Sequence, residues 1–481
     1  MPGVYIVEKN AFPNSVVEVA TAVPAFIGYT EKAEGGGKTL LNTPWRISSL
    51  FDFQVCFGGM APTVFSIADS TPDPPSTGTL SFEVTRVSVP YALYSSMRLF
   101  FDNGGGDCYV VSVGSYAAGA IMEGDLLRGI DALLREQEPT MVVIPEAVYL
   151  PDESSCIRVQ QAALFQCGDQ TKSRVAILDI YNGYKNRSDP AGDCVANFRD
   201  AIGVNQLDYG AAYYPWLNTS ILGVDDVTWE VISRGGLQEL LQKEGAVSQD
   251  LLTEMLKPVK LTPMQIHHAL WASSKLYQRV MAKIRRQMNL LPPSGAMAGV
   301  YSSVDGSRGV WTAPANVGVV SVVFPAVAVS DHDQGDLNVD VKGKSINAIR
   351  AFAGQGVLVW GARTLDGNCL DWRYINVRRT MIFLEQSIRL AVGAYVFESD
   401  EAATWTTIKS MIVNFLTSAW KRGGLQGATP EDAFQVLCGL GETMTAEDVL
   451  NGILRVTVKV AVMRPAEFME FAFAQQQGGK A

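Results

Sequence analysis

The feature that most restricts the possible fold is a set of short, apolar segments that alternate with segments of helical periodicity. Met141 to Ile144 and Arg174 to Ile180 have the composition of continuous buried strands, and helical patterns cover Leu126 to Arg135 and Ser155 to Gln166. Strands that are apolar on both faces must be covered on both faces, which is typical of parallel sheets with helices on either side. The middle of the chain is therefore predicted to be an α/β domain.

Short strands of a different kind are expected near the two ends of the chain. Apolar and polar residues alternate from Ile453 to Met463, which predicts a half-buried strand that ends before Pro465. Further short strands are expected at Phe468 to Phe473 and at Val4 to Glu8. A terminal strand needs a sheet edge, which its own subunit or a neighbouring subunit can provide. The residues expected to make such contacts are Val4, Tyr5, Ile6, Val7, Phe468, Met469, Phe471 and Phe473.

Length and composition limit the class of protein. A chain of 481 residues is too long for one core, so several domains are expected. Its net charge of -10 argues against a nucleic-acid partner, because neutralising phosphates requires a basic surface. The seven cysteines are widely spaced and include no Cys-x-x-Cys, which argues against disulfides or a zinc site. Neither a signal peptide nor a long apolar span is evident, so cytoplasmic assembly and no membrane association are expected.

Two motifs that suggest enzyme chemistry fail on spacing. Gly37-Lys38-Thr39 resembles the end of a phosphate-binding loop, but Lys32 stands where that motif requires its first glycine. Ser294 could be a nucleophile, but Pro292 stands where a nucleophile elbow requires glycine. A glycine-rich loop without a site and a simple turn are the expected structures.

The residues that could bind metal or act as acids are also poorly arranged. His267 and His268 are adjacent in a predicted helix and point about 100° apart, so they cannot share a metal. The acidic segment from Ser330 to Asp340 departs from the spacing of a calcium loop and is expected to be a solvated loop. Asp179 and Asp305 lie at predicted strand or turn ends, where turn formation is expected. The sequence thus predicts no catalytic, cofactor or metal site, and no enzyme.

Distinctive motifs occur along the chain in a fixed order. They are Pro2 to Tyr5, Phe100 to Gly105 (FFDNGG), Pro292 to Val300 (PPSGAMAGV), Arg308 to Asn316, Gly354 to Thr364 (GQGVLVWGART), Trp372 to Arg379 (WRYINVRR), Phe397-Glu398, Trp405 and Pro465-Ala466-Glu467. Together they resemble the contractile tail sheath proteins over nearly the whole chain. We expect structural roles for Trp360, Arg363, Trp372, Arg378, Arg379 and Trp405, with aromatic rings packing a core and guanidinium groups pairing with carboxylates. A direct role between subunits is the alternative.

The resemblance implies a structural subunit of a contractile sheath, with an α/β and α+β multidomain fold. The middle region would be similar to subtilisin without its protease site, the C-terminal sheath domain would be α+β, and extended strands would form terminal arms. In this family, subunits stack as hexameric rings around an inner tube, and the arms complete a sheet in neighbouring subunits. Contraction from a metastable extended state drives the tube through a target envelope, without nucleotide or other cofactor.

The resemblance also implies an organisation and a set of partners. The expected parts are an N-terminal arm (1–20), an N-terminal sheath domain (21–118) with an exposed loop at 70–79, a subtilisin-like domain (119–362), a C-terminal sheath domain (363–464) and a C-terminal arm (465–481). In the C-terminal domain, helices are expected at Met381 to Phe397 and Ala402 to Trp420. Expected partners are further copies of the chain, an inner tube protein, and baseplate and terminator proteins, within a virion tail or a released phage-tail-like particle. The alternatives are a specialised baseplate-proximal or terminal subunit and, less favoured, an α/β hydrolase.

Overall fold

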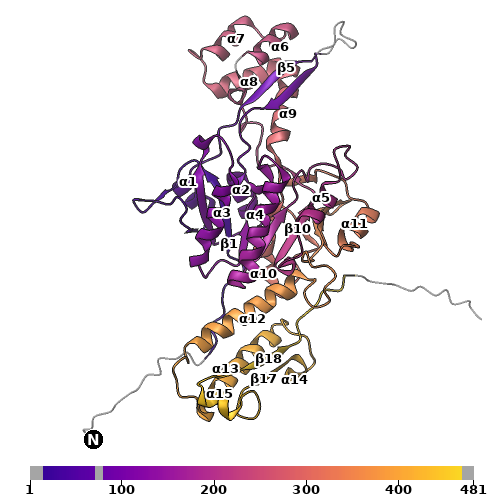
Figure 1. Cartoon of the computed structure of the whole chain (residues 1–481). Helices are drawn as coiled ribbons and strands as arrows, with labels where there is room; N and C mark the ends of the chain where they lie inside the picture. Colours follow the sequence, from indigo (N-terminus) through magenta and orange to yellow (C-terminus); the bar gives the residue numbers. More distant parts are fainter. Residues whose placement is uncertain (1–14, 71–79, 234, 468–481) are drawn as a thin grey trace, which may run out of the picture.

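The computed structural model describes residues 15–70, 80–233 and 235–467. A central sheet with helices on its faces carries a smaller unit at either end (Figure 1). The strands expected at Val4 to Glu8 and Phe468 to Phe473, and nearly all of the loop expected at 70–79, lie outside the described residues.

The central sheet has nine strands and is mostly parallel. Its order is β13 (Val317–Gly318), β16 (Gly356–Trp360), β15 (Asn347–Phe352), β10 (Gly210–Tyr214), β9 (Val175–Asp179), β8 (Met141–Val143), β1 (Pro24–Thr30), β7 (Cys108–Ser115) and β4 (Trp45–Ile47). The strands from β15 to β7 run parallel, and antiparallel strands close both edges. The predicted division between residues 21–118 and 119–362 runs through this sheet, because β1, β4 and β7 come from the first range and the other strands from the second.

Both faces of the sheet are buried under helices, which confirms the prediction from the apolar strands. In β1, Phe26 joins one core cluster, whereas its neighbours Ala25 and Ile27 join the other. The first cluster includes α2 (Leu93–Asp102) and α10 (Ser294–Arg308), and the second includes α3 (Glu123–Ala132), α4 (Glu153–Phe165) and α5 (Cys194–Ala201). Successive residues of a strand point to opposite faces, so wholly apolar strands need both layers.

Two glycines allow α10 to pack closely against α2. A Cβ atom at Gly295 would lie 2.7 Å from the carbonyl oxygen of Ser96, and one at Gly299 would lie 2.5 Å from that of Phe100. These obstacles are backbone atoms, which cannot move aside as a flexible side chain can. The motif PPSGAMAGV therefore has a packing role at this helix crossing.

Replacing Gly299 with alanine is expected to lower the free energy of unfolding by about 1–3 kcal/mol, because the added methyl group overpacks the crossing. Gly306 lies in the same helix, and a Cβ there would meet nothing within 4 Å. Gly306→Ala should therefore be neutral or stabilising by up to about 1 kcal/mol. Urea unfolding of both variants measures the difference, and equal losses would contradict the packing role.

One end unit combines a hairpin with helices that are distant in sequence. The hairpin is β5 (Phe65–Asp69) and β6 (Phe82–Arg86), and the helices are α6 (Gly236–Glu244), α7 (Gln249–Leu256), α8 (Pro263–Ser273) and α9 (Lys275–Met288). A three-stranded sheet of β11 (Leu217–Thr219), β12 (Leu290–Leu291) and β14 (Val322–Pro325) follows. The loop expected from Ser330 to Asp340 is mostly helix α11 (Asp331–Asn338), because Ser330 and Asp333 form a capping box at its start.

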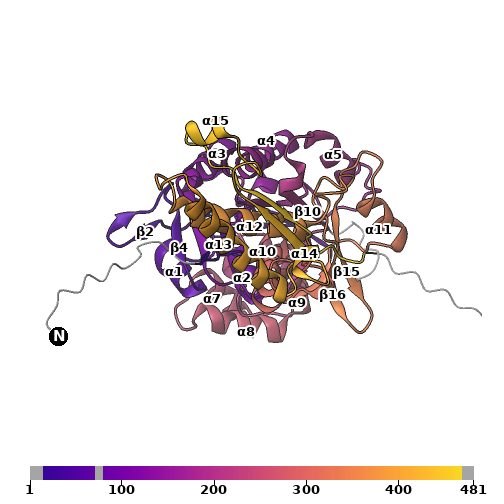
Figure 2. The ribbon, with the colours of Figure 1, turned by 90° about the horizontal axis from the view of Figure 1, so that it is seen from below.

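The other end unit is formed by the C-terminal part of the chain. Its elements are α12 (Ile375–Gly393), α13 (Ala402–Lys421), α14 (Pro430–Ala433), β17 (Phe434–Leu437), α15 (Ala446–Leu450) and β18 (Thr457–Val460). Both predicted helices are present, although α12 begins at Ile375 and not at Met381. The alternation predicted from Ile453 to Met463 is confirmed by half-buried valines, over a shorter strand. Viewed from below, α12 and α13 lie across the central body (Figure 2). In the described part of the chain no helix is long and apolar enough to cross a membrane.

Candidate functional site

Open α/β sheets hold ligands at the carboxyl ends of their parallel strands. In this chain, buried carboxylates fill that position after β8 and after β9. Asp179 ends β9 and accepts hydrogen bonds from the backbone N–H of Ser294 at 2.8 Å and from its Oγ at 2.5 Å. Both residues are buried, and burial raises the pKa of Asp179 to about 7 against the effect of these hydrogen bonds. Asp179 lies at a strand end as predicted, but its side chain joins β9 to the start of α10, so the expected role in turn formation is wrong.

Glu146 occupies the equivalent position after β8, the strand next to β9 in the sheet. Its carboxylate accepts hydrogen bonds from the backbone N–H groups of Tyr29 at 2.8 Å, Ala92 at 3.0 Å and Leu93 at 3.2 Å. The side chain is fully buried, which raises its pKa to about 7. It thereby occupies the beginning of α2, between β1 and β8, where the strand order reverses. This role could not be predicted from the sequence, since Glu146 belongs to none of the motifs.

The phosphate-loop-like segment is a β-hairpin. Its strands are β2 (Glu34–Gly35) and β3 (Lys38–Thr39), and Gly36 and Gly37 adopt positive φ angles of 58° and 74° in the turn. It borders an open hollow of about 820 Å³ beside the ends of β1 and β7. The glycines serve the turn, because this conformation favours residues without a side chain.

The two histidines of α8 have separate surroundings. His267 is buried, with its Nδ1 2.7 Å from the hydroxyl of Tyr277, and burial lowers its pKa. His268 is exposed and lies 3.0 Å from Asp225. Within residues 15–70, 80–233 and 235–467, no three His, Cys, Asp or Glu side chains are placed to hold a metal ion.

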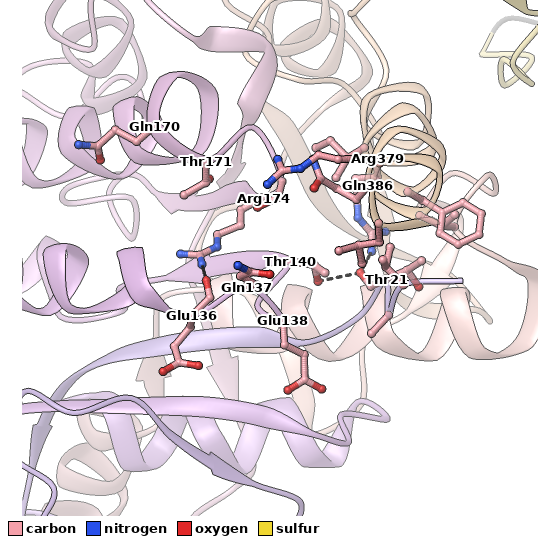
Figure 3. A pocket seen from close by; sticks show the side chains of 18 of the residues that line it. Thr21, Glu136, Gln137, Glu138, Thr140, Gln170, Thr171, Arg174, Arg379 and Gln386 are labelled. Carbon is pink, nitrogen blue, oxygen red and sulfur yellow. Dashed lines mark hydrogen bonds between the residues drawn. The ribbon is translucent and has the colours of Figure 1, made fainter. Parts of the chain in front are cut away.

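A pocket of about 470 Å³ lies at the amino ends of the parallel strands, where α12 meets the starts of β1, β8 and β9. Thr21, Thr140 and Arg174 line it from the central body, and Arg379 and Gln386 line it from α12 (Figure 3). The hydroxyl of Thr140 donates to the carbonyl of Thr21 at 2.8 Å. This junction joins the C-terminal unit to the body, and the motif residue Arg379 lines it.

Arg379 connects three segments at this junction. Its guanidinium donates to the two carboxylate oxygens of Asp305 at 2.9 and 2.6 Å and to the carbonyl of Thr21 at 2.9 Å. Only 3% of either charged side chain is exposed. Asp305 lies within α10, so its expected role in a turn is also wrong.

Arg378 joins α12 to a different segment of the body. It forms an ion pair with Asp208, and its guanidinium lies 3.6 Å from the ring centre of Trp372 and 4.3 Å from that of Tyr209. A planar guanidinium can stack on aromatic rings while it binds a carboxylate, which lysine cannot do equally well.

Arg363 holds the end of the described chain. Its Nε and Nη2 lie 2.9 and 2.5 Å from the carboxylate oxygens of Glu467, which also accepts hydrogen bonds from Asn338 at 2.6 Å and Tyr374 at 3.1 Å. Burial disfavours the charged form of Glu467, but the bonds from Arg363 and Asn338 hold its pKa below the ordinary value. Arg363, Arg378 and Arg379, the three arginines expected to pair with carboxylates, thus all do so.

The motif tryptophans lie outside the fully buried core. Trp360 is 37% exposed and its ring centre lies 4.6 Å from that of Phe352. Trp372 and Trp405 are half-buried, and the indole N–H of Trp405 donates to Asp400 at 2.6 Å. The expectation that these rings pack a core is therefore wrong for Trp360, which lies at the antiparallel edge of the sheet.

The beginning of the described chain is also bound to the C-terminal unit. The backbone N–H of Val19 donates to Ser387 Oγ of α12 at 3.1 Å, and Glu18 forms an ion pair with Arg422 at the end of α13. Residues near both ends of the chain therefore contact the same unit.

Comparisons with known proteins agree with the motif resemblance. The phage tail sheath C-terminal domain family matches residues 370–476. The tail sheath protein of Vibrio phage KVP40 is 28% identical over 31% of this chain and 21% of that protein, and that of Burkholderia phage BcepMu is 32% identical over 21% of this chain and 22% of that protein. Each of these matches spans about a fifth of the curated relative.

Similarity to solved structures extends over the whole chain. The contracted helical sheath of the anti-feeding prophage is 29% identical, with a TM-score of 0.65 and 99% of both chains covered. The contracted sheath of an extracellular contractile injection system, PVC, is 28% identical, with a TM-score of 0.61 and 99% of this chain and 98% of that chain covered. The chain is therefore similar over nearly its whole length to contractile sheath structures, and its residues 370–476 match the phage tail sheath C-terminal domain family.

Proposed function

We propose that this chain is a structural subunit of a contractile sheath. Copies would stack as hexameric rings around an inner tube and contract from a metastable extended state, driving the tube through a target envelope. The observation that carries this proposal is a small, incomplete sheet on the C-terminal unit, together with the full-length similarity to contracted sheaths.

The incomplete sheet consists of β17 and β18. Within the described residues these strands pair only with each other, and beyond the end of β18 Val462 forms an isolated bridge with Leu425. A two-stranded sheet is marginally stable alone, and its open edges can accept further strands. Val4 to Glu8 and Phe468 to Phe473 of neighbouring copies would supply them through main-chain hydrogen bonds. Such joints can persist while rigid bodies rotate.

The remaining parts follow from the same proposal. Residues 363–464 would be the C-terminal sheath domain, 1–20 and 465–481 the arms, and the nine-stranded body the subtilisin-like region without a protease site. Partners would be further copies, the inner tube protein, and baseplate and terminator proteins. Assembly would occur in the cytoplasm, before release of a virion or a phage-tail-like particle.

Deleting residues 468–481 tests the proposal. The truncated chain is expected to remain folded, with a circular dichroism spectrum and thermal unfolding like those of the full chain, because it keeps every residue of the three buried clusters that form the cores of the described chain. It should not form sheaths under conditions in which the full chain does, as judged by sedimentation and electron microscopy. Long, regular sheaths from the truncated chain would refute the strand-exchange role.

A specialised subunit next to the baseplate is the second candidate. A chain in the baseplate structure of the anti-feeding prophage is 28% identical, with a TM-score of 0.62 and 99% of both chains covered. Quantitative mass spectrometry of purified particles distinguishes the two functions. A bulk sheath subunit should be present in many more copies than a single ring holds, whereas a specialised subunit should be present in about one ring.

A further inference from the structure

Helix α12 and its N-cap residue bind the chain near both of its ends. Near the carboxyl end, Tyr374 donates to Glu467, and Asn376 donates from its side chain to the carbonyl of Met463 at 2.9 Å. Near the amino end, Arg379 donates to the carbonyl of Thr21 and Ser387 accepts from the N–H of Val19. These four residues lie along one continuous helix.

The contacts with the two ends of the chain are held apart by the helix itself. Tyr374 and Ser387 are thirteen positions apart, which corresponds to about 20 Å along an α-helix. Between them the helix is largely buried, from Ile375 to Thr380 and again at Ile382, Phe383 and Leu384. The helix has no internal proline, the common cause of a sharp kink, so a displacement at one end can be transmitted along its axis. In Figure 1 this helix extends from the central body into the C-terminal unit.

We infer that α12 couples the two terminal segments, with Arg363 and Tyr374 positioning the carboxyl-terminal segment and Arg379 and Ser387 the amino-terminal one. This inference rests on the proposed function, in which those segments join neighbouring subunits. A load received through one arm would then reach the other arm along α12, without deforming the nine-stranded sheet. Each subunit would respond to its neighbours as one mechanical unit.

A matched pair of variants tests the positioning role. Arg363 and Arg378 flank the start of α12, and their ion pairs are similarly buried, with side-chain exposures of 4% and 18% for Arg363 and Glu467 and 6% and 21% for Arg378 and Asp208. Only the first pair includes a residue next to a terminal segment. Arg363→Met is expected to raise the critical concentration for assembly at least about tenfold, and Arg363→Lys should recover part of that loss. Arg378→Met should lower the unfolding temperature similarly but leave the critical concentration within about threefold.

A double-mutant cycle tests the coupling itself. Effects of Arg363→Met and Ser387→Ala on unfolding should add, because Arg363 binds Glu467 whereas Ser387 binds Val19, so the two residues share no partner. Their effects on the critical concentration should not add: the double variant should be little worse than Arg363→Met alone. Additive effects on both quantities, or equal assembly defects in the Arg363 and Arg378 variants, would overturn the inference. If deleting residues 468–481 abolishes assembly while Arg363→Met does not affect it, only the coupling by α12 fails. If the deletion leaves normal sheaths, the proposed function itself fails.

Discussion

Replacing Arg379 with methionine is expected to lower the free energy of unfolding by about 3–5 kcal/mol, which is typical of removing one partner of a buried ion pair. Asp305 would keep its negative charge in a site where only 3% of its side chain is exposed, without the two hydrogen bonds from the guanidinium. The carbonyl of Thr21 would also lose a donor. Urea unfolding followed by circular dichroism measures the loss.

Two controls separate the buried charge from other effects. Asp331→Asn breaks the ion pair with Arg350, but 97% of the Asp331 side chain is exposed, so less than about 1 kcal/mol should be lost. Combining Arg379→Met with Asp305→Leu removes both charges and should restore much of the stability lost in the single variant. A single variant that loses no more than Asp331→Asn would show that solvent reaches the Arg379 pair.

The large predicted effect has a functional consequence. Arg379 is the side chain through which α10, α12 and the segment before β1 meet, so its loss should loosen the C-terminal unit from the body. If sheath contraction requires the subunit to move as a set of rigid bodies, a loosened junction should reduce the fraction of assembled particles that contract fully. Electron microscopy of particles carrying Arg379→Lys, which retains the positive charge near Asp305, should show a smaller defect than Arg379→Met.

Local patterns were sufficient to predict the covered parallel sheet. Met141 to Ile144 is apolar at every position, and a strand with no polar face has to be buried on both sides. The half-buried strand after Ile453 could be predicted because its polar residues alternate with apolar ones, so that only one face has to be buried. Both inferences need only the side chains of the strand itself.

Other features depend on contacts between distant residues and could not be predicted. Arg363 meets Glu467 across 104 positions, and Arg378 meets Asp208 across 170. An arginine in a motif indicates that a carboxylate is near but not which of the 49 acidic residues it is. Separate domains were predicted for residues 21–118 and 119–362 for the same reason. The strands β1 and β8, which join the two ranges in one sheet, are adjacent only after folding.

Asp179 and Glu146, the buried carboxylates at the carboxyl ends of β9 and β8, lead to the second large prediction, an unusual dependence of stability on pH. Burial raises the pKa of Asp179 from its ordinary value to about 7, so the folded chain holds this proton more tightly than the unfolded chain. The resulting stabilisation is fully present below about pH 4 and is lost as the pH rises through about 7, a change of roughly 4 kcal/mol from this group. Most native carboxylates have the opposite effect, because pairing lowers their pKa.

Asp179→Asn should remove the contribution of Asp179 to this pH dependence while keeping the local structure. The amide oxygen can accept from the Ser294 N–H, and the amide nitrogen can donate to Ser294 Oγ, so both contacts survive without a charge. The variant should match the parent chain near pH 4 and exceed its stability at pH 8. Glu146→Gln provides the contrast, because Glu146 accepts only N–H donors and an amide nitrogen would face one of them. That variant should lose stability at every pH, and an unchanged pH profile for Asp179→Asn would show that Asp179 is already ionised at pH 5.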